Sequence, residues 1–171
     1  MGKPAFVDRL WPDMCAVYRD ADLSCACLDL QDSYDADVPL LLAMCLAERA
    51  GHFIAADDLK KLMGEARAWR ETVIRPLRQA RRAMKEKFQA PAELGLRNDI
   101  KRLELEAERL HVLRIAEALP PARGDGILPA MACLALYAVP AEMAGGFMRA
   151  FNNAYDAEVL EDVRLKMGNA R

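Results

Sequence analysis

The chain has 171 residues and a formal net charge of −2 at pH 7, and hydrophobic residues make up 53% of it. This length suits one domain with a substantial core, and the apolar content excludes intrinsic disorder over most of the chain. Only two serines and one threonine stand beside abundant alanine, leucine, arginine and glutamate, which favours helices over strands.

The first three predicted helices occupy roughly the first fifty residues. The first begins near Trp11, and Asp22 has the side chain expected of an N-cap for the second. Asp35 or Asp37 caps the third helix, which is apolar nearly all round over residues 38–47. Because a helix that is apolar on every side must be enclosed, we expect the third helix to be the central, most buried one.

The fourth helix has the clearest amphipathic pattern in the sequence. Its apolar residues recur at steps of three and four, so at 100° per residue they share one arc of the helix. They are Leu59, Leu62, Ala66, Trp69, Val73, Leu77, Ala80, Met84 and Phe88. Pro76 lies inside this helix, where a proline removes one backbone donor and clashes with the carbonyl of Thr72. The sequence therefore predicts a kink there.

A short turn at residues 89–91 leads to a fifth helix of similar length, so the two helices must form an antiparallel hairpin. The apolar seam of the fifth helix is Leu96, Ile100, Leu103, Ala107 and Leu110. A sixth helix is expected near residues 128–138 and a seventh near 141–167. In the seventh, the pair Gly145–Gly146 weakens the helix or lets another backbone approach it.

These elements predict an all-α fold. We expect a single-domain helical bundle of about seven helices, built around the long antiparallel helical hairpin. The domain covers residues 1–171, with frayed ends at 1–10 and 168–171. The longest uncharged run, residues 126–141, is interrupted by two prolines and is shorter than the ~20 residues of a spanning helix. We therefore expect no membrane span.

The cysteines indicate a reducing compartment. There are five of them, an odd number, and they lie mostly in apolar stretches. We interpret them as small buried hydrophobic residues rather than a disulfide framework, which predicts a cytoplasmic protein. Cys25 and Cys27 are two residues apart, so on a helix their thiols point to different sides and suit no common metal ion.

No catalytic or metal-binding motif is present in the sequence. Glu108 and His111 have the i, i+3 spacing of di-iron helix bundles, but such bundles use that pair twice, and the other histidine, His52, has no glutamate three residues before it. A cysteine nucleophile would need a histidine beside it, and no spacing indicates one. Phosphate-binding loops, dinucleotide fingerprints and serine nucleophile elbows are also missing from the sequence. We therefore expect no cofactor, no metal and no catalytic residue.

The charges are strongly segregated along the chain. Residues 1–58 carry eleven acids and four bases, whereas residues 59–88 carry ten bases and three acids. On the fourth helix five bases fall on the side opposite the apolar arc, broken only by Glu71. This basic ridge consists of Arg67, Arg75, Arg78, Arg82 and Lys85. Arginine suits bidentate recognition of carboxylate or phosphate, so the ridge is a candidate docking surface for an anion.

The alternative is that the ridge is neutralised within the protein. The acidic first three helices are one source of compensating charge. The other source is the fifth helix, with Asp99, Glu104, Glu106 and Glu108. The sequence leaves both alternatives open.

Several strings in the first half of the chain resemble a bacterial family of unknown function, domain-of-unknown-function family 2390. They include Leu10–Trp11, Tyr18, residues 27–32 (CLDLQD) and Asp37–Val38. The most specific string is Trp69–Arg70 followed by residues 73–78 (VIRPLR), Arg81–Arg82 and Met84–Lys85. The resemblance spans roughly residues 10–88 and implies an all-helical cytoplasmic bacterial protein. It implies no catalytic residue.

Two functional hypotheses follow. The first is a non-enzymatic interaction or regulatory module that docks an acidic protein or another polyanion on the basic ridge, with sequence-specific nucleic acid disfavoured because a single stripe of bases cannot read base edges. The second is a small-ligand-binding bundle or minor enzyme, whose pocket is lined by Trp11, Tyr18, Gln31 and Trp69. The scarcity of histidine, serine and threonine favours the first hypothesis. The sequence gives no indication of the oligomeric state.

Overall fold

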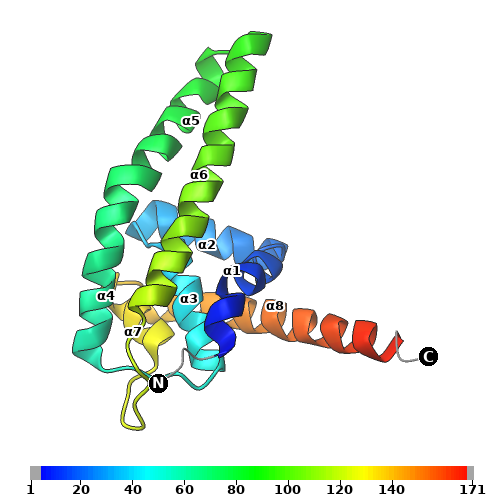
Figure 1. Cartoon of the computed structure of the whole chain (residues 1–171). Coiled ribbons are helices and arrows are strands. Elements are labelled where there is room, and N and C mark those ends of the chain that lie inside the picture. Colours follow the sequence, from blue (N-terminus) through cyan, green and yellow to red (C-terminus); the bar gives the residue numbers. More distant parts are fainter. Residues whose placement is uncertain (1–4, 169–171) are drawn as a thin grey trace. The chain divides into compact units, whose positions relative to one another are not determined.

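The structure is a computed structural model that describes residues 5–168 (Figure 1). Within those residues the chain forms helices connected by loops, and the prediction of an all-α fold is confirmed. The chain divides into two compact units. The core unit contains the chain up to Ala56 and from Pro121 onward, and the hairpin unit contains residues 57–120. The expectation that the whole chain acts as one domain stays a prediction.

The helices of the core unit are α1 (Ala5–Val17), α2 (Ala21–Tyr34), α3 (Val38–Arg49), α7 (Pro129–Leu136) and α8 (Ala141–Gly168). The hairpin unit contains α4 (Ala56–Trp69), the π-helical turn η1 (Arg70–Ile74), α5 (Arg75–Lys87) and α6 (Pro91–Ala118). Because α4, η1 and α5 follow one another without a break, they form one rod. The described part of the chain therefore holds seven helical rods, as predicted. None of its helices combines the length and the apolar character that crossing a membrane requires.

Helix α3 is the centre of the core unit. It packs against α1, α2 and α7, while α8 packs against α1 and α2. Asp37 caps α3, because its carboxylate accepts a hydrogen bond of 3.1 Å from the backbone N–H of Leu40. Nearly every residue from 38 to 47 is buried, which confirms the prediction of a fully enclosed helix.

Two helix starts differ from the prediction. Helix α1 begins at Ala5 rather than near Trp11, so residues 5–10 are helical, and Val7 and Leu10 are buried. Helix α2 is capped by Asp20, not Asp22, because the Asp20 carboxylate accepts the backbone N–H of Leu23 at 2.9 Å. An aspartate two positions further along is already inside the helix and cannot satisfy its first free N–H groups.

The loops of the core unit are fixed by backbone contacts. Ile54 and Ile127 form an isolated antiparallel bridge, in which the Ile127 N–H donates to the Ile54 carbonyl at 2.9 Å. Gly126 lies against this crossing so closely that a Cβ atom there would be 2.7 Å from the Ile54 nitrogen. At Gly145 and Gly146, by contrast, an added Cβ would meet only the Arg149 side chain, so within the described part of the chain no other backbone comes within 4 Å of that position.

A half-buried acid holds the start of α7. The carboxylate of Glu48, on α3, accepts the backbone N–H of Ala130 at 3.0 Å. Burial raises the pKa of Glu48, although the backbone N–H groups of Ala130 and Met131 act in the opposite direction. The contact gives the short, apolar α7 a negatively charged partner at its positive end.

Three of the five cysteines are buried in the core unit, as predicted: Cys27, Cys45 and Cys133. Burial raises the pKa of the Cys27 and Cys133 thiols to about 12, and it also raises that of Cys45. Thiols held protonated in this way are poor nucleophiles and poor metal ligands. Cys25 is exposed, so the interpretation of buried cysteines does not extend to it.

In the hairpin unit the rod of α4, η1 and α5 runs antiparallel to α6, which confirms the predicted hairpin (Figure 1). The predicted kink falls at a π-helical turn that directly precedes Pro76: the N–H of Arg75 donates to the carbonyl of Arg70, five residues earlier. Widening the helix at this point accommodates a proline that lacks an N–H and crowds the carbonyl four residues before it. The turn contains one residue more than a regular α-helical turn. The side chains of α4 are therefore rotated about the helix axis by about 100° relative to those of α5, compared with a regular helix.

Candidate functional site

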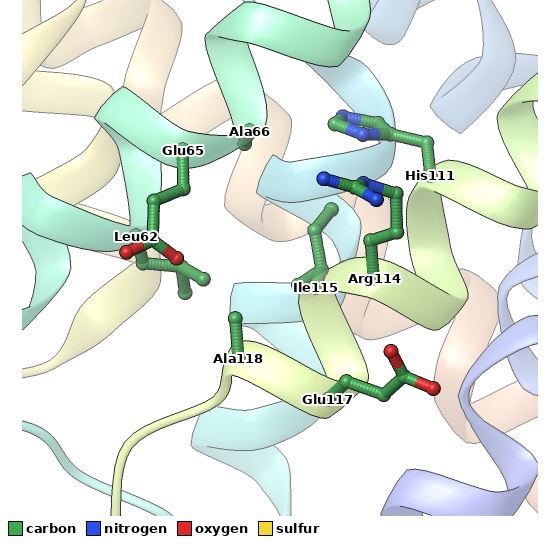
Figure 2. A pocket seen from close by; sticks show the side chains of 8 residues that line it. All are labelled: Leu62, Glu65, Ala66, His111, Arg114, Ile115, Glu117 and Ala118. Atoms are coloured by element: carbon green, nitrogen blue, oxygen red, sulfur yellow. The ribbon is translucent and has the colours of Figure 1, made fainter.

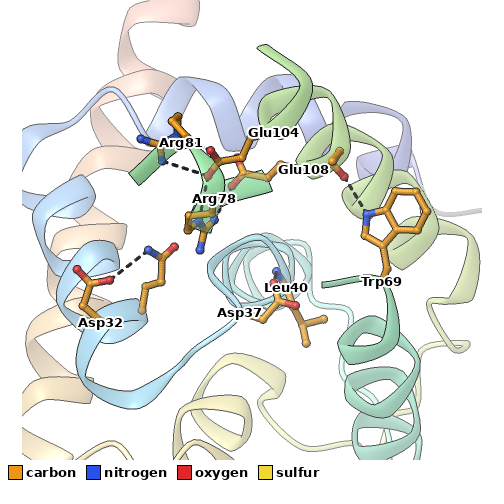
Figure 3. A network of polar contacts seen from close by, with 10 residues as sticks. Asp32, Asp37, Leu40, Trp69, Arg78, Arg81, Glu104 and Glu108 are labelled. Carbon is orange, nitrogen blue, oxygen red and sulfur yellow. Dashed lines mark hydrogen bonds and ion pairs between the residues drawn. The ribbon is translucent and has the colours of Figure 1, made fainter. Parts of the chain in front are cut away.

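The central part of the basic ridge is neutralised within the hairpin. Arg78 donates from Nε to Glu104 at 2.9 Å and from Nη2 to Glu108 at 2.7 Å, and its side chain is only 16% exposed (Figure 3). Arg81, which the predicted ridge did not include, donates to Glu104 at 2.5 and 3.2 Å. We call Arg78, Arg81, Glu104 and Glu108 the arginine–glutamate cluster.

The pKa of Glu104 shows how strongly the two arginines of the cluster act on this carboxylate. Burial by itself raises the pKa of Glu104, but the hydrogen bonds and charges of Arg81 and Arg78 outweigh it and hold the pKa below the ordinary glutamate range. The placement of Arg78 on an exposed ridge was therefore wrong, and the alternative of neutralisation by the fifth helix holds for this residue. Arg78 is neutralised because Glu104 and Glu108 lie one turn apart on the face of α6 that meets α5.

The other members of the basic ridge are exposed. Arg75 forms an ion pair of 2.6 Å with Glu71 one turn earlier on the same rod, yet 44% of its side chain is exposed. Arg67, Arg82 and Lys85 are also exposed. Arg67 precedes the π-helical turn, whereas Arg75, Arg82 and Lys85 follow it. A regular helical wheel therefore gives the direction of Arg67 relative to these three residues with an error of about 100°. The ridge as a docking surface stays a prediction, carried by Arg75, Arg82 and Lys85.

The predicted apolar seam of α6 is mostly exposed. Leu96, Leu103 and Leu110 are 56%, 48% and 37% exposed, whereas the buried residues of α6 include Glu104 and His111. Because the three leucines are seven residues apart, they lie along one line of the helix with a drift of about 20° per step. We call Leu96, Leu103 and Leu110 the leucine face. The arginine–glutamate cluster takes the position against α5 that the sequence assigned to these leucines.

The four residues predicted to line a pocket belong to different units. Trp69 is in the hairpin unit, where its indole N–H donates to the carbonyl of Ala107 at 3.0 Å (Figure 3). Trp11 and Gln31 are half-buried in the core unit, and Tyr18, just after α1, is 38% exposed. The proposal that they form one pocket stays a prediction.

A cavity of about 320 Å³ lies in the hairpin unit between α4 and the end of α6 (Figure 2). None of the four predicted pocket residues lines it. Its walls are Leu62, Glu65, Ala66, His111, Arg114, Ile115, Glu117 and Ala118. Trp69 holds one wall in place, since the guanidinium of Arg114 lies 5.2 Å from the centre of its ring. From the sequence, His111 was a candidate only as the partner of Glu108 in a metal site, and no sequence pattern indicated Arg114 or this cavity.

Within the part of the chain that the structure describes, no group of three or more histidine, cysteine, aspartate or glutamate side chains is placed to hold a metal ion. Glu108, the predicted partner of His111 in a metal site, is occupied by Arg78.

The fold and these surfaces define an all-helical protein with a helical core and a helical hairpin, in which the hairpin carries a charged cluster inside and a leucine face outside. The chain belongs to the family described as protein of unknown function (DUF2390), whose model matches residues 9–115, from within α1 almost to the end of α6. This match confirms the resemblance seen in the sequence. No curated protein and no solved structure matches the chain.

Proposed function

We propose that this protein is a non-enzymatic interaction module of the bacterial cytoplasm, and that its hairpin docks an acidic, amphipathic helix of a partner protein. The leucine face is the observation that carries the proposal. Three leucines lie in line on one helix, each more than a third exposed, and aligned exposed apolar side chains offer a surface for a partner. Their spacing of seven residues is that of a seam onto which another helix packs.

The leucine face alone supports a modest affinity. Complete burial of a leucine is worth about 1.5 to 3 kcal/mol, and these three are already about half buried, so covering them contributes roughly 1 kcal/mol each. A docked helix also loses conformational and rotational freedom. The partner must therefore gain further energy elsewhere, and charge is the obvious source.

The charge of the hairpin unit favours an acidic partner. Residues 57–120 contain fifteen bases and eleven acids, a net charge of +4, whereas the rest of the chain contains nine bases and fifteen acids, a net charge of −6. A surplus of positive charge accelerates the approach of an acidic protein even when the charges surround the contact rather than form it. A polyanion such as nucleic acid has less to gain, since it has no apolar face to place on the leucines.

The experiment compares two leucines of the same helix. Leu103 belongs to the leucine face, and Leu105, at 55% exposure, lies on the opposite side of α6. Affinity-tagged wild-type protein and the variants Leu103→Gln and Leu105→Gln are incubated with extract of the source organism, and bound proteins are quantified by mass spectrometry. We expect a partner that Leu103→Gln loses at least tenfold and that Leu105→Gln retains.

Two outcomes contradict the proposal. One is equal retention by both variants, which places the contact elsewhere. The other is that sedimentation of purified wild type shows a dimer that Leu103→Gln abolishes, which assigns the leucine face to a second copy of this chain. If the partner is found, its capture by wild type must weaken as salt rises from 50 to 500 mM, about a threefold shortening of the Debye length.

A further inference from the structure

The cavity between α4 and α6 has walls of both charge signs over an apolar floor. Leu62, Ala66 and Ile115 form the floor and are almost fully buried. Glu65 on α4, and Arg114 and Glu117 on α6, are charged and accessible. Figure 2 shows Glu65 and Arg114 on opposite sides of the space.

The opposite charges of this cavity do not neutralise each other. Among the residues that the structure describes, no ion pair joins Arg114 to Glu65 or to Glu117. Arg114 is held instead over the face of Trp69, whose indole is itself fixed to the Ala107 carbonyl. A guanidinium anchored through one face keeps its N–H edge available for a planar acceptor such as a carboxylate.

We propose that this cavity binds a small zwitterion of the amino-acid type, with its carboxylate on Arg114, its ammonium on Glu65 and its short aliphatic chain on the floor of Leu62, Ala66 and Ile115. A simple carboxylic acid matches Arg114 but is repelled by Glu65 and Glu117. A simple amine matches the glutamates but is repelled by Arg114. Only a ligand that carries both charges satisfies both walls, and the volume of about 320 Å³ suits a molecule of that size. This site is independent of the leucine face.

The test measures binding of three matched probes to the full chain by ¹H–¹⁵N NMR titration: norvaline, pentanoic acid and butylamine. The zwitterion has both charged groups, and each of the others lacks one. We expect saturable shifts with norvaline, confined to residues near the cavity, and at least tenfold weaker binding of pentanoic acid and butylamine. Arg114→Gln and Glu65→Gln should each weaken norvaline binding at least tenfold.

Matched controls separate recognition from general charge effects. Arg102→Gln on α6 and Glu86→Gln on α5 remove the same charges at exposed positions outside the cavity, and both should bind norvaline as wild type does. Ala118→Leu should weaken binding by filling part of the cavity that Ala118 lines. If Arg114→Gln fails to fold, Glu65→Gln and Ala118→Leu still decide the question. Absence of saturation with norvaline, equal binding of pentanoic acid or butylamine, or unchanged binding by Glu65→Gln would each overturn the proposal.

Discussion

The arginine–glutamate cluster predicts an unequal effect of two neighbouring substitutions. Glu104 and Glu106 both lie on α6 and both bind arginine at short distance, Glu104 to Arg81 at 2.5 Å and Glu106 to Arg109 at 2.6 Å. The Glu104 side chain is 7% exposed, whereas that of Glu106 is 50% exposed. The difference in burial decides how much stability each substitution costs, because water replaces a lost partner only at an exposed site.

For Glu104→Gln the cost comes from the two arginines that lose their countercharge. Removing one partner of a fully buried pair costs about 3 to 5 kcal/mol, and an exposed pair is worth about 0 to 1 kcal/mol. Arg78 and Arg81 are 16% and 24% exposed, between those limits. We therefore expect a loss of about 2 kcal/mol, a fall in melting temperature of roughly 4 to 8 °C for a chain of this size. Glu106→Gln should change stability very little.

The assay is urea unfolding followed by circular dichroism at pH 7, with thermal melts as a second measurement. The pH dependence has a definite sign. Because the folded-state pKa of Glu104 is lowered, its contribution is complete above the ordinary glutamate pKa of about 4.3 and is lost as the pH falls below it. The difference between wild type and Glu104→Gln should therefore shrink in acid. Equal destabilisation by both substitutions at pH 7 would refute the reasoning.

Three further predictions concern the core unit and the π-helical turn. Gly126→Ala should destabilise the protein by about 1 to 3 kcal/mol in urea unfolding, because its Cβ meets backbone at 2.7 Å, whereas Gly124→Ala, with open space around it, should be nearly neutral. In native protein at pH 8 a thiol reagent should modify exposed Cys25 quickly and buried Cys27 only after denaturant is added; rapid labelling of Cys27 would contradict its burial. Pro76→Ala should keep the melting temperature within a few degrees of wild type, because the packing of the hairpin retains the π-helical turn, and a severe loss of folding would contradict this.

The raised pKa values of the Cys27 and Cys133 thiols also predict that the folded protein loses stability at alkaline pH. A thiol whose folded-state pKa is about 12 contributes stability that is complete below the ordinary thiol pKa of about 8.5 and is lost as the pH rises toward 12.

The sequence was sufficient for the elements whose pattern is decided locally. The uninterrupted apolar run of residues 38–47 has no other stable position than an enclosed helix, and the short turn between two long helices permits only a hairpin. A regular helical wheel was also enough to show that α5 is amphipathic. These features depend on the period of the helix and on chain connectivity alone.

The surfaces were harder to predict because they depend on how two helices meet. The wheel assumed 3.6 residues per turn through Pro76, and the π-helical turn breaks that assumption. It also assumed that leucines face the neighbouring helix. In the hairpin, Arg78 and Arg81 reach Glu104, and the leucines turn outward. Arg78 and Glu104 are 26 residues apart in the sequence, and their pairing is not visible in the pattern of either helix.

The central claim, that the leucine face docks an acidic helix of another protein, is tested most directly by photocrosslinking in living cells. A photoreactive amino acid is placed at Leu103 in one strain and at Leu105 in another, and the adducts are identified by mass spectrometry. We predict a discrete adduct with one acidic protein from position 103 and none with that protein from position 105. Identical adducts from both positions, or adducts at 103 only with other copies of this chain, would contradict the claim.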